Sequence, residues 1–169
     1  MAYIVGTPGN DNISGTPGND TLVGLSGNDI LNNNPAQAGG FDILFGNGGL
    51  DSLNLGFSVS GIAYGGQDND GLVGSNGADT IYGDNGADTL EGRNGNDILV
   101  GTNVQNDSLN DLADIIFGNL GNDTMYGSSG NDLVVGNEGN DIIFGGKGDD
   151  RVDGATETDI IFGDLGNDT

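Results

Sequence analysis

The sequence predicts an all-β fold, a β-solenoid in which two nonapeptides form one coil of 18 residues and build two short-strand parallel sheets. The first observation is a unit of nine residues, G-x-x-G-N-D-x-apolar-x, which recurs along almost all of the 169 residues. The second is an apolar residue two places after the Asp of each unit. The third is the glycine content, 35 residues, against an average usage of about 7%. A fixed short period of this kind indicates a solenoid.

Each unit divides into a turn and a strand. Positions 1 to 6 hold turn residues, mainly Gly, Asn, Asp, Ser and Pro, whereas positions 7 to 9 predict a three-residue strand whose middle side chain points inward. Stacked about 4.8 Å apart, such strands form parallel sheets. Two units per coil therefore place position 8 in a thin core between two sheets and stack the turns along two edges. The sequence has no 3.6-residue periodicity of apolar residues, so we expect no helix.

Position 8 is apolar in every completed unit, and these residues are the predicted core. They are Ile13, Leu22, Leu31, Leu44, Leu53, Ile62, Leu72, Ile81, Leu90, Leu99, Ile116, Met125, Val134, Ile143, Val152 and Ile161. Three interruptions occur: an insertion near 33–38, a unit with one extra residue at 55–64, and a polar insertion near 102–112. Because the register resumes after each, we expect one domain over residues 1–169 with two loops. We also expect the chain to be a piece of a longer repeat protein, since both ends stop within a unit.

The charge of the chain narrows the class of partner. The formal net charge is −23, and the only three cations are Arg93, Lys147 and Arg151. Nucleic acid is excluded as a partner because its phosphates require basic contacts. The absence of Cys and His excludes disulfides, zinc fingers and haem sites. No apolar run approaches the roughly 20 residues of a transmembrane helix. For a chain this acidic and polar, disorder is the alternative in metal-free conditions.

Position 6 carries a carboxylate in every unit but one. These residues are Asp11, Asp20, Asp29, Asp42, Asp51, Asp70, Asp79, Asp88, Asp97, Asp114, Asp123, Asp132, Asp141, Asp150, Asp159 and Asp168, with Ser60 at position 6 of the exceptional unit. Odd and even units alternate, so the carboxylates form two rows, one on each edge. A single Asp in such a turn commonly caps its own backbone. Two whole rows would repel strongly without counterions, and the periodic pattern therefore favours a cation-binding role.

These features resemble the RTX (haemolysin-type) calcium-binding nonapeptide repeats of secreted proteins, whose consensus is G-G-x-G-x-D-x-U-x. The resemblance covers about residues 3 to 169, and the segment GGKGDDRVD at 145–153 matches the consensus in full. Elsewhere Gly is rare at position 2, which holds Thr7, Ser75 and Arg93 among others. Thr and Arg adopt left-handed backbone conformations poorly, so we expect some turns to differ in shape from those of the family.

The resemblance implies a right-handed parallel β-roll that binds Ca²⁺ between successive turns of one edge. One turn supplies its Asp and the carbonyls of positions 2 and 4, and the next turn supplies its Asp and the carbonyls of positions 1 and 3. The implied ligands beside Asp123 and Asp141 are the carbonyls of Asn119, Gly121, Gly136 and Glu138. Those beside Asp132 and Asp150 are the carbonyls of Ser128, Gly130, Gly145 and Lys147. Counting carboxylate pairs along both rows gives at most thirteen ions.

One outer face of the predicted roll carries an aromatic ladder at position 9 of the even units. Its residues are Phe45, Tyr82, Tyr126, Phe144 and Phe162. Stacking within the sheet accounts for this ladder, and self-association or contact with another domain is the functional alternative.

The predicted function is calcium ion binding, with calcium-dependent folding of a structural or binding module in an exported or cell-surface protein. We expect a secreted or extracellular location, because free Ca²⁺ is scarce in the cytosol and extracellular modules bind it weakly. The alternatives are an ice-binding module or a self-assembling filament or layer module. Position 5 varies too much for a regular ice-matching lattice. An enzyme is not expected, and a glycan-active enzyme is the weakest alternative, because no unique carboxylate pair breaks the repeat.

Overall fold

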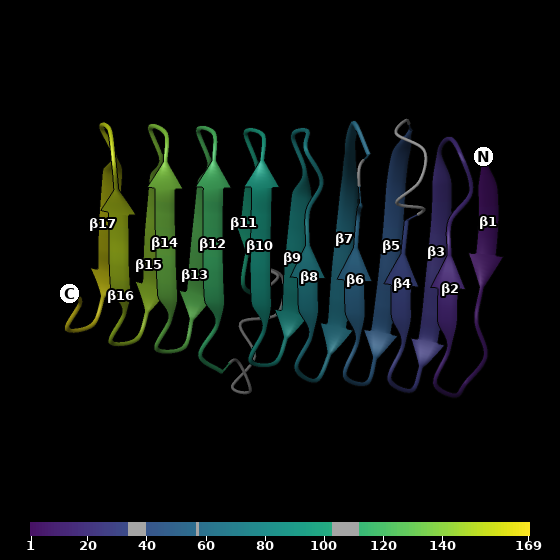
Figure 1. Ribbon diagram of the computed structural model, residues 1–169. Coiled ribbons are helices and arrows are strands. Elements are labelled where there is room, and N and C mark those ends of the chain that lie inside the picture. Colours follow the sequence, from purple (N-terminus) through teal and green to yellow (C-terminus); the bar gives the residue numbers. More distant parts are fainter. Residues whose placement is uncertain (34–39, 57, 103–111) are drawn as a thin grey trace.

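The protein is a stack of flattened coils, and a computed structural model describes it at residues 1–33, 40–56, 58–102 and 112–169. Figure 1 shows two layers of parallel strands that face each other, with the N- and C-termini at opposite ends of the stack. No helix occurs among the described residues. Consecutive strands alternate between the two sheets, so each coil contributes one strand to each sheet. This is the predicted parallel β-roll.

The odd-numbered strands form a nine-stranded sheet in the order of the chain. They are β1 (Ala2–Val5), β3 (Asp20–Ser26), β5 (Phe41–Gly48), β7 (Ser60–Gln67), β9 (Thr80–Asn85), β11 (Ile98–Val100), β13 (Thr124–Ser129), β15 (Ile142–Lys147) and β17 (Ile160–Leu165). The even-numbered strands form an eight-stranded sheet. They are β2 (Asn12–Ser14), β4 (Ile30–Asn32), β6 (Ser52–Asn54), β8 (Gly71–Val73), β10 (Thr89–Asn94), β12 (Ile115–Leu120), β14 (Leu133–Glu138) and β16 (Arg151–Ala155).

Many strands are longer than the three residues that the repeat predicts. β12 and β14, for example, pair at Ile115–Leu133 and again at Asn119–Asn137, after a gap at the position-1 glycines. The strand thus continues through position 3 of the following unit. Continuation is possible because the position-2 residues adopt the same left-handed conformation, with φ of 75° at Asn119 and 78° at Asn137, and therefore remain in register.

The core is a single file of position-8 side chains between the sheets. Leu22, Leu44, Leu90 and Ile116 are buried, and the same holds for nearly all of the predicted set. The exceptions are Ile62 and Val152, which are partly exposed, and Ile161 in the last coil, which is 46% exposed. Alternate residues of each strand point to the two faces of a sheet, so one apolar residue per strand is enough to close this narrow interior.

One predicted register is wrong, in the unit with an extra residue. Gly61, not Ser60, pairs with Asp42 and so occupies position 6. Ala63, which is fully buried, takes the place assigned to Ile62 in the core. Leu55 is also fully buried, and a Cβ on Gly61 would lie 2.5 Å from its Cδ2 atom. An apolar side chain therefore fills the space that a position-6 carboxylate occupies in other turns.

The two predicted loops, near 33–38 and 102–112, lie largely outside the described residues. The stacking of the flanking turns is nevertheless regular, because the N–H of Asp20 donates to Asp42 Oδ1 and that of Asp88 donates to Asp114 Oδ1, 22 and 26 residues later. Within the described ranges, no helix is long and apolar enough to cross a membrane.

Candidate metal centres

The position-6 carboxylates lie on the inner side of the turns, at two edges of the roll. We call the odd edge the row of turns that carries Asp11, Asp29, Asp51, Asp70, Asp88, Asp114, Asp132, Asp150 and Asp168. The even edge carries Asp20, Asp42, Asp79, Asp97, Asp123, Asp141 and Asp159. In Figure 1 these are the lower and upper rows of turns. Most of the carboxylates are buried, with exposures of 4% or less, whereas Asp11, Asp159 and Asp168 are partly exposed.

One oxygen of each carboxylate links it to the preceding coil. The N–H of Asp123 donates to Asp141 Oδ1 at 2.8 Å, and the N–H of Asp132 donates to Asp150 Oδ1 at 2.9 Å. The same bond joins all nine members of the odd edge in sequence. On the even edge it joins Asp20 to Asp42 and then runs from Asp79 to Asp159. The structure therefore brings every sequence-predicted Asp into its expected row.

The second oxygen of many carboxylates has no hydrogen-bond partner among the residues that the structure describes. Buried Oδ2 atoms of this kind belong to Asp29, Asp51, Asp70, Asp97, Asp123, Asp141 and Asp150. A buried ionised oxygen that lacks a partner is costly, because it has lost its hydration without a replacement. A row of such oxygens is the feature that a bound cation would satisfy.

Because the glycines at position 1 have no side chain, these oxygens can lie close to a carbonyl of the next coil. A Cβ on Gly92 would lie 2.5 Å from Asp97 Oδ2 and 2.8 Å from the carbonyl oxygen of Gly118. The same pair of contacts surrounds Gly118, where the oxygens belong to Asp123 and Gly136, and Gly127, where they belong to Asp132 and Gly145. Only a residue without a side chain lets a carboxylate and a carbonyl from two coils approach the same face of the backbone.

The other implied ligands lie in the same stacked turns. The carbonyl oxygen of Glu138 accepts the N–H of Gly121 at 2.9 Å, and that of Lys147 accepts the N–H of Gly130 at 2.9 Å. Each of these carbonyls keeps a second lone pair. Asn119 and Ser128 are at φ of 75° and 83°, the left-handed conformation shared by most position-2 residues.

The electrostatics of the rows oppose ionisation. Burial, together with the charges of stacked neighbours, raises the pKa of Asp70 to about 8 and that of Asp97 to about 8. The same causes raise the pKa of Asp51 to about 6 and that of Asp123 to about 6. Since these neighbours are themselves carboxylates one coil away, a cation between them would remove the main source of repulsion and favour the ionised forms.

The donors present fit a hard divalent cation. Carboxylate and carbonyl oxygens suit Ca²⁺, which takes six to eight oxygen ligands in flexible geometry. Among the residues that the structure describes, no group of three or more Asp, Glu, His or Cys side chains is placed to hold a metal ion. Any such site must therefore combine carboxylates with backbone carbonyls, as the arrangement around Gly118 allows.

The sequence pattern did not reveal a second ladder on the outer side of the turns, at position 5. The Oδ1 atom of Asn122 accepts the N–H of Asn140 at 2.8 Å, and equivalent bonds recur from Asn10 to Asp149 along both edges. The frequent Asn before each Asp was the available signal. Except at Asp149, whose carboxylate accepts the N–H of Asn167, this ladder binds successive turns to one another through neutral amide groups.

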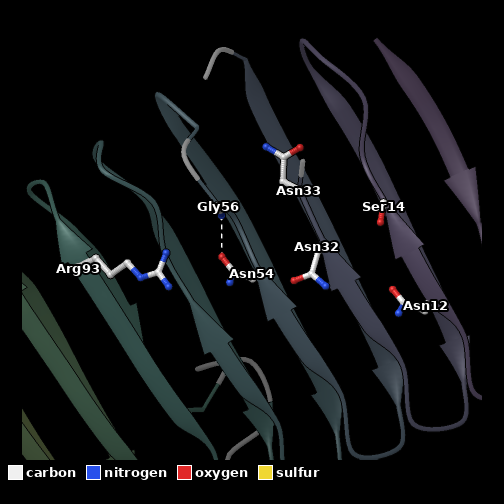
Figure 2. A pocket seen from close by; sticks show the side chains of 7 residues that line it. All are labelled: Asn12, Ser14, Asn32, Asn33, Asn54, Gly56 and Arg93. Atoms are coloured by element: carbon white, nitrogen blue, oxygen red, sulfur yellow. Dashed lines mark hydrogen bonds between the residues drawn. The ribbon is translucent and has the colours of Figure 1, made fainter. Parts of the chain in front are cut away.

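A polar cavity of about 550 Å³ lies on the outer face of the eight-stranded sheet. Figure 2 shows Asn12 and Ser14 on β2, Asn32 at the end of β4, Asn54 on β6, and Arg93 approaching from β10. Asn54 Oδ1 accepts the N–H of Gly56 at 2.8 Å. The described lining residues include no carboxylate, but one of them, Asn33, donates to Asp42 Oδ2 on the even edge.

Comparison with known proteins agrees with this geometry. The family model of the RTX calcium-binding nonapeptide repeat matches in four copies, at residues 4–34, 64–99, 108–143 and 135–169. No curated protein matches the chain. The matched ranges contain most of the stacked carboxylates and leave out residues 35–63, where the first insertion and the shifted register lie.

Proposed function

The chain belongs to the RTX calcium-binding nonapeptide repeat family, and we propose that it is a structural module whose β-roll folds when Ca²⁺ binds between its turns. Binding of calcium by these repeats is the property of the family, and the β-roll is a structural calcium-binding module. The observation that carries the proposal is the row of buried Oδ2 atoms, among them those of Asp97, Asp123 and Asp141, that lack a hydrogen-bond partner.

Calcium supplies what the sequence lacks for stability. The chain has a formal charge of −23 and 35 glycines, so repulsion and backbone entropy both oppose folding. Its core is only one side chain deep. A ligand that binds the folded state and not the unfolded state adds its binding free energy to folding. The free chain is then expanded, and the loaded chain is compact.

The proposed ligand sets follow the stacked turns. Between Asp123 and Asp141 they include the carbonyls of Asn119, Gly121, Gly136 and Glu138. Between Asp132 and Asp150 they include those of Ser128, Gly130, Gly145 and Lys147. Two carboxylates and four carbonyls give six oxygens, which suits Ca²⁺. Their support is the approach of Asp123 Oδ2 and the Gly136 carbonyl to one face of Gly118.

The module is proposed to act outside the cell, as part of an exported or cell-surface protein with a surface-layer, adhesin or carrier role. Extracellular Ca²⁺ is millimolar, which matches the weak affinity of extracellular modules. In the calcium-poor cytosol the chain stays unfolded and can be threaded for export.

The aromatic face is proposed as a contact surface between two copies of the chain. Phe45, Tyr64 and Tyr82 form one stack, and Tyr126, Phe144 and Phe162 form another, with ring centroids 4.9 to 5.0 Å apart and rings nearly parallel. Stacking within the chain stiffens the sheet. The outer surfaces of these rings and of Ile98 and Ile142 form the apolar face that a second copy would cover.

Small-angle X-ray scattering during a calcium titration tests the proposed module. The radius of gyration is expected to fall from that of an expanded chain to a compact value, about 15 to 16 Å for a globular chain of this length and larger for an elongated roll. Magnesium at the same concentration serves as the control, because it demands a rigid octahedral shell. A compact particle in excess chelator at neutral pH would overturn the proposal.

A further inference from the structure

The turn that ends at Asp79 differs from the turns described above. Ser75 is fully buried, and its N–H donates to Asp79 Oδ2 at 2.5 Å. Its hydroxyl lies 2.9 Å from the same Oδ2 and 3.0 Å from Oδ1. The Oδ2 atom of Asp79 is therefore satisfied by hydrogen bonds within its own turn, whereas the Oδ2 atom of Asp97, one coil later, has no partner among the described residues.

Two further turns show the same closure. Thr16 directs its N–H, at 2.6 Å, and its hydroxyl, at 2.9 Å, to Asp20 Oδ2. Thr7 makes the equivalent pair of bonds to Asp11 Oδ2, at 2.5 and 3.0 Å. Neither Thr7, Thr16 nor Ser75 has a positive φ, unlike the position-2 residues Asn47, Asp84, Arg93, Asn119, Ser128 and Asn137. The described turns therefore occur in two states. In the closed state, the N–H and hydroxyl of the position-2 residue bond the carboxylate of the same turn. In the open state, the position-2 residue has a positive φ and makes no such bonds.

Asp42 is also satisfied by hydrogen bonds, from Asn33, which begins the same turn, and from Ser58 of the next turn on the even edge. Its Oδ2 atom lies 2.6 Å from Asn33 Nδ2 and 2.6 Å from the Ser58 hydroxyl, both of which are buried. The next turn of the even edge has Gly61 at position 6 and no carboxylate. From Asp20 to Asp79, therefore, the inner side of the even edge is filled by side-chain hydroxyls, by the amide of Asn33 and by the apolar side chain of Leu55.

The hydroxyl of Ser128, also at position 2, has a different acceptor and does not close its turn. Ser128 keeps the left-handed conformation, with φ of 83°, and its hydroxyl donates to the carbonyl of Thr102 in the preceding coil at 3.2 Å. For Ser75, the preceding turn on the same edge is the irregular one around Gly61. The hydroxyl of Ser75 turns inward to Asp79, and its turn is closed.

We propose that Ser75, Thr7 and Thr16 are metal-replacing clamps, so that the turns of Asp79, Asp11 and Asp20 hold no calcium toward the next coil. This inference rests on the proposed function, because it concerns which of the family's inter-turn sites this chain retains. It removes the sites between Asp11 and Asp29, between Asp20 and Asp42, and between Asp79 and Asp97. Of the thirteen sites that the sequence pattern allows, at most ten therefore remain. On the even edge, the first remaining site lies between Asp97 and Asp123.

Native mass spectrometry of the intact chain in calcium tests the proposal by counting ions. The wild type is expected to bind at most ten. Ser75→Asn places at position 2 the residue found in the open turns of Asn47 and Asn119, and it is expected to gain one ion. Asn119→Thr introduces a β-branched residue that disfavours the left-handed conformation, and it is expected to lose one. Ser52→Asn, the same exchange at an exposed position of β6, is the matched control and leaves the count unchanged.

The outcomes separate the two proposals. A wild-type count above ten, or equal counts for the wild type, Ser75→Asn and Asn119→Thr, overturns the clamp assignment while calcium binding stands. A chain that binds no calcium at all refutes the proposed function itself. Far-ultraviolet circular dichroism verifies that each variant is folded. Should Ser75→Asn fail to fold, Thr7→Asn on the odd edge provides the same test, with a gain of one ion expected.

Discussion

The backbone N–H of Asp123 donates to Oδ1 of Asp141 at 2.8 Å, which joins two carboxylate-bearing turns that are 18 residues apart in the chain. The bond fixes one oxygen of Asp141, whereas the other, Oδ2, is buried and has no partner in the described part of the chain. Asp123 and Asp141 thus each have one oxygen that bonds the preceding coil and one oxygen that is left for the proposed calcium ion. An Asn would keep the first oxygen and replace the second with an NH₂ group.

Asp141→Asn is expected to weaken calcium-induced folding. The amide oxygen can still accept the N–H of Asp123, but the NH₂ group replaces the ligand oxygen and the charge is lost. We expect the calcium midpoint, followed by circular dichroism, to rise several-fold. Asp149→Asn is the control, since Asp149 is exposed and accepts the N–H of Asn167 at position 5. An unchanged midpoint for Asp141→Asn would remove Asp141 from the ligand set.

Gly118→Ala is expected to destabilise the calcium-loaded roll by about 1 to 3 kcal/mol, the usual cost of forcing an extra group into a packed site. The new Cβ would meet both Asp123 Oδ2 and the carbonyl oxygen of Gly136. Gly9→Ala is the matched control, because its Cβ would approach nothing closer than 3.9 Å. Urea unfolding at saturating calcium measures both variants, and equal losses would contradict the close approach at position 1.

Acid is expected to replace calcium in part. In the folded state the pKa of Asp70 and that of Asp97 are raised by burial to about 8, from an ordinary value of 3.8. Folded pKa values above the unfolded ones mean that the folded state retains protons that the unfolded state releases. Stability of the calcium-free chain is therefore greatest below about pH 4 and falls as the pH rises toward 8.

A pH series in excess chelator, followed by circular dichroism, checks this expectation. Strand signal should be present at pH 4 and decline toward pH 8. At pH 7, calcium binding should release protons, because it requires ionised carboxylates. A strand signal that stays constant across this pH range would show that the buried carboxylates do not control folding.

The aromatic face gives a separate prediction. Phe144 lies between Tyr126 and Phe162 in one stack, with ring centroids 4.9 Å away on both sides. Phe144→Asp combined with Tyr126→Ser is expected to lower the sedimentation coefficient of the calcium-loaded protein to that of a single copy. Identical sedimentation of the variant and the wild type would leave the rings with the role of stiffening the sheet only.

The repeat itself determined much of the fold in advance. A period of nine with Asp at position 6 and an apolar residue at position 8 fixes which side chains face inward, because strand residues alternate. The two sheets, both carboxylate rows, and the core file from Ile13 to Ile143 with the exception of Ile62 were confirmed. Membership of the RTX family was also confirmed. The number of ions and the individual ligand sets stay predictions.

What the sequence did not reveal depends on local geometry. In the unit that contains Ser60 and Gly61, no G-N-D triplet marks the register, so one extra residue could be assigned to either side. Pairing with Asp42 and Asp79 across the sheet settles it for Gly61. The closure of Ser75 onto Asp79 depends on a φ angle and a hydroxyl rotamer, and the contrasting state of Ser128 shows that residue type alone does not determine it.

The most direct test of a calcium-folded roll is a titration of the metal-free chain at pH 7, followed by far-ultraviolet circular dichroism. We predict a cooperative gain of β-strand signal with Ca²⁺, little change with Mg²⁺, and full reversal by chelator. A chain that shows the same strand signal in excess chelator as in millimolar calcium would contradict this prediction.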